Sequence, residues 1–279
     1  MIMDNQNQAP VYIVTGATDA TGTIIAKRLA AQGKPLIIAC YNEQRGRDFA
    51  EKLRQTALNH DISFVRLDLN SFAGVKDFCG KIQGLGRPVA ALINNASYIA
   101  RHSETSPDGY EKIVQVNFLS TVLLTLRLVP LMPEGAHIIF STSLSRKLVS
   151  LPYEFPAVNS FIPLTAYAQS KQALTLMSIY ISTVLRTKRI QVNCVNPGII
   201  SVGVARMSKW LESFGDYYQL VHDPSNGATA VIRALESADT GFIFKGSDTQ
   251  VKTTTYLKNR EVFIRLCNDT MRLLKKHLQ

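Results

Sequence analysis

The stretch VYIVTGATDATG at residues 11–22 joins a short β-branched run to a helical segment, IIAKRLAAQG. A glycine-containing turn between a strand and a helix lets the backbone approach a pyrophosphate, whose charge is favoured by the free N–H groups and the positive dipole end of the helix. Such a turn is a weak signal alone. Here it has the strand before it and the helix after it that the motif demands, so we expect a dinucleotide-binding turn.

Similar apolar runs follow along the chain, with helix-length segments between most of them. They occupy residues 36–40, 62–67, 90–94, 137–141, 190–195 and 241–244. These runs are continuously apolar rather than alternating, which is typical of parallel strands covered on both faces. The pattern predicts an α/β fold with a doubly wound parallel sheet, Rossmann-type, in three α/β/α layers. No linker, repeat or low-complexity tract divides the chain, so we expect a single domain over residues 1–279, with its core at 10–250.

The composition excludes several classes of protein. A chain of 279 residues with 46% hydrophobic residues can bury a large core and is neither disordered nor fibrous. The longest apolar stretch, 118–132, contains Arg127 and Pro130 and is shorter than the roughly 20 residues of a membrane span. The first ten residues are polar and do not match a secretion signal, so we expect a cytoplasmic protein without a membrane span.

The net charge of +10 is unevenly distributed, because residues 252–279 hold seven Lys and Arg against two acids. We interpret the C-terminal segment, 251–279, as a basic helix with a solvated outer face and expect no nucleic-acid binding. The alternative is a docking helix for an acidic partner or a membrane surface. We expect its apolar residues to pack on the domain; they are Val262, Phe263, Leu266, Leu273 and Leu274.

The four cysteines are scattered without C-x-x-C spacing, which favours small buried thiols. We therefore expect no metal site and no disulfide.

The end of the second predicted strand, Cys40-Tyr41-Asn42, is where an acid would select an unphosphorylated ribose and an arginine would accept a 2′-phosphate. Neither residue type stands at Cys40 or Tyr41. Arg45 and Arg47 follow closely, either as phosphate ligands or as ordinary surface arginines. We expect NADP(H) to be favoured over NAD(H).

The strongest chemical pattern is Y167-A-Q-S-K171 at the start of a long helical segment, with S141-T-S143 closing the strand before it. Residues i and i+4 share one helix face, so the Lys171 ammonium is expected beside the Tyr167 phenol. A cation there would lower the pKa of the phenol from about 10 toward working pH and make proton transfer practicable. Ser143 could hydrogen-bond the substrate oxygen.

Taken together, these motifs resemble the short-chain dehydrogenase/reductase family over roughly residues 10–250. The further matching segments are L67-D-L69, N94-N-A-S97, Asn117 within VQVNFLS, and N196-P-G198. The resemblance implies that the cofactor is bound by Gly16, Thr18, Asp19, Ala20, Thr21, Gly22, Tyr41, Asn42, Arg45, Asp68, Leu69, Asn95, Ala96, Tyr167, Lys171, Pro197, Gly198 and Ile200.

The resemblance also implies catalytic roles. Tyr167 would protonate a carbonyl or deprotonate an alcohol, Lys171 would also bind the nicotinamide ribose, and Ser143 would orient the substrate. Asn117 would hold a water that links Lys171 to solvent. For Asn117 and Asn94 the alternative is ordinary capping of the backbone.

Three positions depart from the family pattern. Ala20 stands at the second glycine of the turn, Ser97 replaces a glycine, and Val202 replaces a threonine after Pro-Gly. The 24 residues from Ser143 to Tyr167 exceed the dozen or so that are common. The nearest analogies are the retinol-dehydrogenase-like and carbonyl-reductase-like branches.

Two irregular segments, 144–166 and 199–224, begin at carboxyl ends of strands and are expected to form the substrate side. The aromatic and apolar residues of the second segment could instead pack on the core; they are Met207, Trp210, Leu211, Phe214, Tyr217 and Tyr218.

We therefore expect an enzyme that moves a hydride between NAD(P)(H) and the alcohol/carbonyl pair of a small, moderately apolar substrate, such as a steroid, retinoid, quinone or lipid-derived carbonyl. The alternative is a non-catalytic nucleotide-sensing or scaffold protein on the same fold. Apolar helical surfaces within 118–130 and 172–185 are candidate subunit contacts of a homodimer or homotetramer; the alternative is that either stretch faces the sheet.

Overall fold

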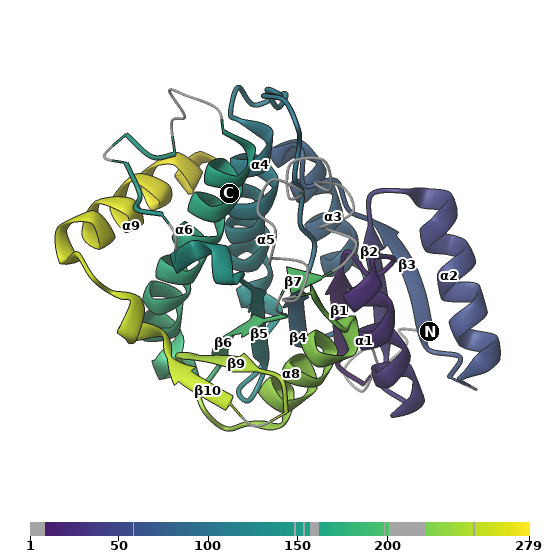
Figure 1. Ribbon diagram of the computed structural model, residues 1–279. Coiled ribbons are helices and arrows are strands. Elements are labelled where there is room, and N and C mark those ends of the chain that lie inside the picture. The colour runs from purple at the N-terminus through teal and green to yellow at the C-terminus, as the bar shows by residue number, and fades with distance from the viewer. Residues whose placement is uncertain are drawn as a thin grey trace.

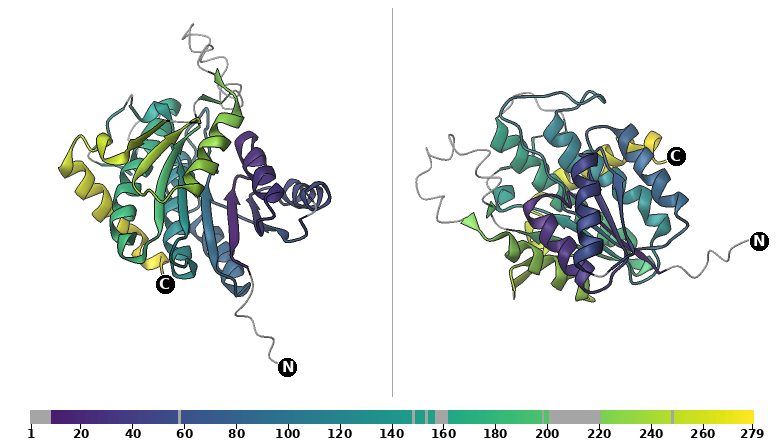
Figure 2. Two further views of the ribbon diagram at one scale, coloured as in Figure 1. Left: turned by 90° about the horizontal axis from the view of Figure 1, so that it is seen from below. Right: turned by 90° about the vertical axis from the view of Figure 1, so that its right-hand side faces the viewer.

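The computed structural model describes residues 9–57, 59–147, 149–152, 154–156, 162–197, 199–200, 221–247 and 249–279. Within them, eight strands form one sheet in the order β10–β9–β6–β5–β4–β1–β2–β3. Helices cover both faces of this sheet (Figures 1 and 2). The predicted doubly wound α/β fold is confirmed.

The eight strands of this sheet, apart from β10, follow the predicted apolar runs to within one residue at each end. They are β1 (Val11–Thr15), β2 (Leu36–Cys40), β3 (Ile62–Arg66), β4 (Val89–Asn94), β5 (His137–Ser141), β6 (Gln191–Asn196), β9 (Phe242–Lys245) and β10 (Thr249–Lys252). All neighbours pair in parallel except β10, which runs antiparallel to β9. The sequence did not predict β10, because this edge strand is mostly exposed and carries no apolar run.

The helices that connect the strands begin at polar caps in several cases. They are α1 (Ala20–Ala31), α2 (Glu43–Thr56), α3 (Phe72–Gly84), α4 (Lys112–Val114), α5 (Ser120–Leu128), α6 (Pro163–Val184), α8 (Pro224–Glu236) and α9 (Arg260–Leu274). The side chains of Asn42, Ser71 and Asn259 accept backbone N–H groups in the first turns of α2, α3 and α9. A π-helical turn, Gln115–Leu119, connects α4 to α5.

The sheet separates two hydrophobic cores. Val14 of β1 packs with Leu29 of α1 and Val231 of α8, whereas the adjacent Ile13 belongs to the core on the opposite face with α3, α5, α6 and α9. Successive side chains of a strand point to opposite faces, so a strand buried on both sides must be apolar throughout. This confirms the three-layer arrangement and explains the continuous apolar runs.

The C-terminal helix α9 packs along the face that holds α5 and α6 (Figure 1). Leu266 and Leu274 are completely buried there, and Val262, Phe263 and Leu273 pack partly against the same core. Arg127 of α5 donates to the carbonyl oxygens of His277 and Gln279 at 2.6 and 2.8 Å. The predicted packing of this segment on its own domain is confirmed, and part of the surface proposed for subunit contacts is covered by it.

One helical stretch in the described residues, Lys112–Leu131, is long and apolar enough to cross a membrane by length and composition. Its most apolar window is 78% buried inside the molecule, as in a core helix. It is therefore weak evidence for a membrane span.

The four cysteines are free and buried, as predicted. Within the described ranges, no three His, Cys, Asp or Glu residues are grouped so that they could hold a metal ion.

Candidate active site

The turn after β1 lies where the strand order reverses, because β1 pairs with β2 on one side and with β4 on the other. Ligands of doubly wound sheets bind at this position, outside the carboxyl ends of the strands. Gly16 has a φ of 61°, and a Cβ there would lie 2.8 Å from the Cα of Ala96. The side chain of Asn95 donates to the carbonyl oxygens of Thr15 and Gly16 at 3.2 Å each. The turn and the end of β4 are thus held together by close backbone contacts.

The geometry of the turn fits a pyrophosphate. A Cβ at Gly22 would lie 2.1 Å from the carbonyl oxygen of Gly16, so only glycine allows this approach. The side chain of Asp19 makes no capping hydrogen bond to α1, and the first N–H groups of a helix have no partner within the helix. Thr21 is 4% exposed, and its hydroxyl has no hydrogen-bond partner. Helix N–H groups and a buried hydroxyl are suitable donors for phosphate oxygens.

Ala20 does not disturb this turn. It is the first residue of α1 and has no positive φ, so its methyl group causes no backbone strain. The local structure therefore accommodates alanine at this position, and Ala20 gives no support to the non-catalytic alternative.

The expected adenosine end of the site lies at the carboxyl ends of β2 and β3. Tyr41 follows β2 and is 64% exposed. The side chain of Asn42 accepts the N–H of Arg45 at 2.9 Å, and the Arg45 guanidinium donates to the carbonyl oxygen of Thr18 in the cofactor turn at 3.1 Å. Arg45 thus reaches the turn, as a phosphate ligand would.

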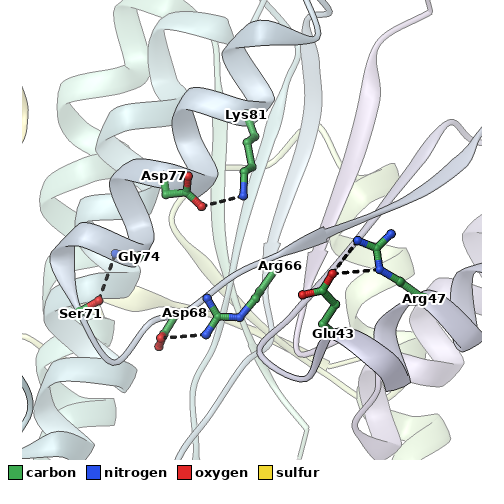
Figure 3. Close-up of polar contacts among 8 residues, drawn as sticks. All are labelled: Glu43, Arg47, Arg66, Asp68, Ser71, Gly74, Asp77 and Lys81. Carbon is green, nitrogen blue, oxygen red and sulfur yellow. Dashed lines mark hydrogen bonds and ion pairs between the residues drawn. The ribbon is translucent and has the colours of Figure 1, made fainter.

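The other sequence candidate, Arg47, pairs with a residue of its own helix. Its guanidinium pairs with the Glu43 carboxylate at 2.6 Å (Figure 3). The guanidinium also lies 5.5 Å from the centre of the Phe64 ring. After β3, the Asp68 carboxylate accepts the N–H of Asn70 at 2.9 Å. The side chain of Leu69 is buried in the core, so only its backbone is available to a cofactor.

The predicted catalytic residues meet at the carboxyl end of β5. Tyr167 and Lys171 share one face of α6, with the Lys171 ammonium 5.6 Å from the centre of the Tyr167 ring. The ammonium is buried and donates to the carbonyl oxygen of Ser141 at 3.0 Å. Ser143 follows β5 and its hydroxyl bonds to the Tyr167 phenol. The i, i+4 spacing predicted this arrangement correctly.

The protonation of this pair differs from the expectation. Burial raises the pKa of Tyr167, and hydrogen bonds with Ser97 and Ser143 offset only part of that rise. Burial also lowers the pKa of Lys171 to about 8. The Lys171 ammonium bonds to the Ser141 carbonyl rather than to the phenol, and the predicted lowering of the Tyr167 pKa is wrong.

Asn117, in the π-helical turn, links the loop after β4 to α6. Its amide accepts the N–H of Tyr98 at 2.7 Å and donates to the Tyr98 carbonyl at 2.8 Å. It also donates to the Ser170 hydroxyl at 3.3 Å, and Ser170 donates to the carbonyl of Tyr167 at 2.7 Å. These contacts match the capping alternative for the Asn117 side chain. The side chain of Asn94 bonds inside the core to α5.

Two further side chains contribute to the site. The Ser97 hydroxyl, at a position where the family pattern has glycine, bonds to the Tyr167 phenol. Arg146, in a 3₁₀ turn after β5, is buried and donates to the carbonyl of Ser143. The replacement of glycine by Ser97 was visible in the sequence, whereas the burial of Arg146 depends on tertiary packing that no local pattern shows.

Apolar side chains surround Tyr167 on the expected substrate side of the site. A small apolar cluster of Ala100, Ile113 and Ala166 packs with Tyr98, Ile99 and Tyr167. In the 144–166 segment, Leu151 and Phe155 are buried, and Phe155 contacts Phe118 with ring centres 5.6 Å apart.

Several predicted residues near the nicotinamide end are described less fully. Pro197 packs against the start of α8, where a Cβ on Gly227 would lie 2.7 Å from the Pro197 Cβ. The backbone of Ile200 belongs to β7 (Ile199–Ile200), which pairs with β8 (Val221–His222). The remaining predictions, Gly198 and the apolar residues between 201 and 220, lie outside the described residues.

Comparisons with known proteins agree with this geometry. Residues 10–211 match the family model described as short chain dehydrogenase. The mouse (Mus musculus) polyprenol dehydrogenase is 31% identical over 210 residues, which are 72% of this chain and 63% of that protein. The human (Homo sapiens) retinol dehydrogenase 13 is 32% identical over 200 residues, 70% of this chain and 60% of the relative. The matched part thus spans about three fifths of both relatives.

A crystal structure of a putative uncharacterized protein from Mycobacterium paratuberculosis has the same fold, with a TM-score of 0.77 and 22% identity over 96% of this chain and 94% of that chain. Of the two branches suggested by the sequence, the named relatives support the retinol-dehydrogenase-like one. The family model covers well over half of the chain. The chain belongs to the short-chain dehydrogenase family.

Proposed function

We propose that this protein is an oxidoreductase that moves a hydride between NADP(H) and the alcohol/carbonyl pair of an apolar substrate. One observation carries the proposal: the Tyr167 phenol meets the Ser143 hydroxyl and the buried Lys171 beside a turn that fits a pyrophosphate. The bound nicotinamide would donate or accept the hydride, and the protein would supply the proton and orient the substrate.

The protein residues then act on the substrate oxygen. The raised pKa of Tyr167 keeps its phenol neutral at pH 7, which is the form that donates a proton to a carbonyl. Ser143 would hold the substrate oxygen by its hydroxyl group. With a pKa of about 8, Lys171 is mostly protonated at pH 7 and keeps a positive charge beside the Tyr167 ring. The role of Asn117 in a water-mediated proton path stays a prediction.

An apolar substrate is supported by two independent features. Tyr167 packs with an apolar cluster of Ala100, Ile113 and Ala166, so the proton donor lies against an apolar wall. Two relatives are named for polyprenol and retinol, which are both apolar alcohols. We infer that a long apolar alcohol, or the corresponding aldehyde or ketone, is the substrate.

NADP(H) is favoured over NAD(H) because no acid stands at Tyr41 to bind a free ribose 2′-hydroxyl. Arg45 lies against the cofactor turn, where a 2′-phosphate would be close. A homodimer or homotetramer and a cytoplasmic location stay predictions.

Turnover of a carbonyl panel tests this function directly. The purified protein would be mixed with NADPH or NADH and with aldehydes that range from retinal and a prenyl aldehyde to short polar ones, and the loss of reduced nicotinamide would be followed. We expect oxidation of NADPH that increases with the apolar character of the aldehyde. Cofactor binding without turnover of any carbonyl or alcohol would contradict the proposed activity.

A further inference from the structure

Position 41 presents an unusual side chain for the adenosine end of the site. An uncharged tyrosine follows β2 where a 2′-phosphate would need a cation. Tyr41 is 64% exposed. The charge required for NADP(H) must therefore come from neighbouring positions.

Arg66, the last residue of β3, lies directly beside Tyr41. In the parallel pairing of the two strands, Arg66 is the partner of Cys40, the residue that precedes Tyr41. Its guanidinium lies 4.9 Å from the centre of the Tyr41 ring, within the range of a cation–π contact. The pairing of β2 with β3 therefore places the positive charge of Arg66 beside the uncharged Tyr41.

Asp68 fixes the other side of the Arg66 guanidinium. The two groups are 3.3 Å apart (Figure 3), and the second carboxylate oxygen accepts the N–H of Asn70. A guanidinium has five N–H donors, so one ion pair leaves donors for a phosphate. The Arg66 side chain is 42% exposed and accessible to a ligand.

Arg47 provides a natural contrast on the adjacent helix. Its guanidinium donates twice to one oxygen of Glu43, at 2.6 and 3.0 Å. The pKa of Glu43 is lowered chiefly by its hydrogen bond with Arg47 and also by the charges of Arg66 and Lys81. Arg47 is thus a nearby exposed arginine with a partner on its own helix and no contact with Tyr41 or Asp68.

We propose that Arg66 selects the cofactor: held on the Tyr41 ring and by Asp68, it binds the 2′-phosphate of NADP(H) together with Arg45. This inference rests on the proposed function, because it assigns a residue to the cofactor site of that function. In this assignment, the positive charge that distinguishes NADP(H) from NAD(H) is carried by Arg66 at the end of β3, and not by residue 41, which follows β2.

Calorimetric titration of NADPH and NADH into the wild type, Arg66→Gln and Arg47→Gln tests the assignment without any turnover. The Arg66→Gln variant lacks a charged hydrogen bond to the phosphate and should bind NADPH about tenfold more weakly than the wild type, or weaker still. Its affinity for NADH should stay within about twofold of the wild-type value. Arg47→Gln should stay within about twofold for both cofactors, because an exposed ion pair contributes little. Thermal unfolding should show that both variants are folded, since both side chains are on the surface.

Adenosine 2′,5′-bisphosphate and 5′-AMP give a second readout that omits the nicotinamide. The wild type should prefer the bisphosphate, and Arg66→Gln should lose most of that preference. Raising the salt concentration should reduce the preference of the wild type more than that of Arg66→Gln, because screening acts on the charge that the variant lacks.

The failure of this inference is distinguishable from the failure of the proposed function. If the wild type binds NADPH and NADH but Arg66→Gln keeps the wild-type ratio of affinities, or if Arg47→Gln loses as much as Arg66→Gln, the assignment of Arg66 is overturned and the oxidoreductase remains. If the wild type binds neither cofactor, the proposed function itself is wrong.

Discussion

The cofactor side and the substrate side of the site are held in different ways. On the cofactor side, the turn after β1 touches the end of β4 through backbone atoms, and Asn95 and the glycines fix that contact. On the substrate side, residues 149–152 are held by side chains from elsewhere: Arg265 of α9 donates to the carbonyl of Pro152 at 3.0 Å, and Gln169 of α6 donates to that of Ser150 at 3.3 Å. Local sequence motifs therefore encode the first side, while the second depends on contacts between distant segments.

The largest effect should come from a methyl group added on the cofactor side. Gly22→Ala places a Cβ 2.1 Å from the Gly16 carbonyl, so the turn must shift. We expect nucleotide binding to be lost, with a destabilisation of about 1–3 kcal/mol from overpacking. Gly80→Ala in α3 is the matched control, because a Cβ there meets nothing within 4 Å and alanine favours the helix. Calorimetry and thermal unfolding measure both effects, and intact binding by Gly22→Ala would refute the close-contact model.

The lowered pKa of Lys171, which lies between the two sides, should make the stability of the protein depend on pH. Burial lowers the pKa of Lys171 from 10.5 to about 8, so between these values the unfolded state binds more protons than the folded state. The free energy of unfolding should therefore rise with pH across that window, by on the order of 3 kcal/mol from this group.

Lys171→Met should lack this part of the rise. Denaturant unfolding at a series of pH values would measure the difference between the two proteins. Parallel curves for wild type and variant from pH 8 to 10.5 would mean that Lys171 does not carry a lowered pKa.

A smaller and local effect is expected on the substrate side. Arg265→Leu removes the contact from α9 to Pro152. It should increase hydrogen exchange in residues 149–152 and raise the KM for an apolar substrate, with NADPH affinity unchanged. Arg272→Leu is the control, because this arginine also pairs with Asp269 on the same helix but is 82% exposed. Equal exchange in the two variants would show that α9 does not hold the segment.

The sequence predicted those parts of the structure that depend on local pattern. The inner strands follow continuous apolar runs because they are buried on both faces, and the Tyr167–Lys171 pair follows from the period of a helix. The edge strand β10 was missed because it is mostly exposed and carries no apolar run.

Electrostatic properties were less predictable. The pKa of Tyr167 depends on how deeply the phenol is buried and on where the Lys171 ammonium bonds, and both are set by the assembled fold. The stacking of Arg66 on Tyr41 arises from the pairing of β2 with β3, two strands whose register no motif specifies.

A comparison of wild type with Tyr167→Phe tests the proposed oxidoreductase most directly. NADPH affinity would be measured by calorimetry, and turnover with the best carbonyl of the panel by the loss of reduced nicotinamide. Because only the phenolic hydroxyl is removed, we predict that the variant binds NADPH like the wild type and loses turnover at least about a hundredfold, as expected for a general acid. Equal turnover in both proteins would contradict the assignment of Tyr167 as the proton donor.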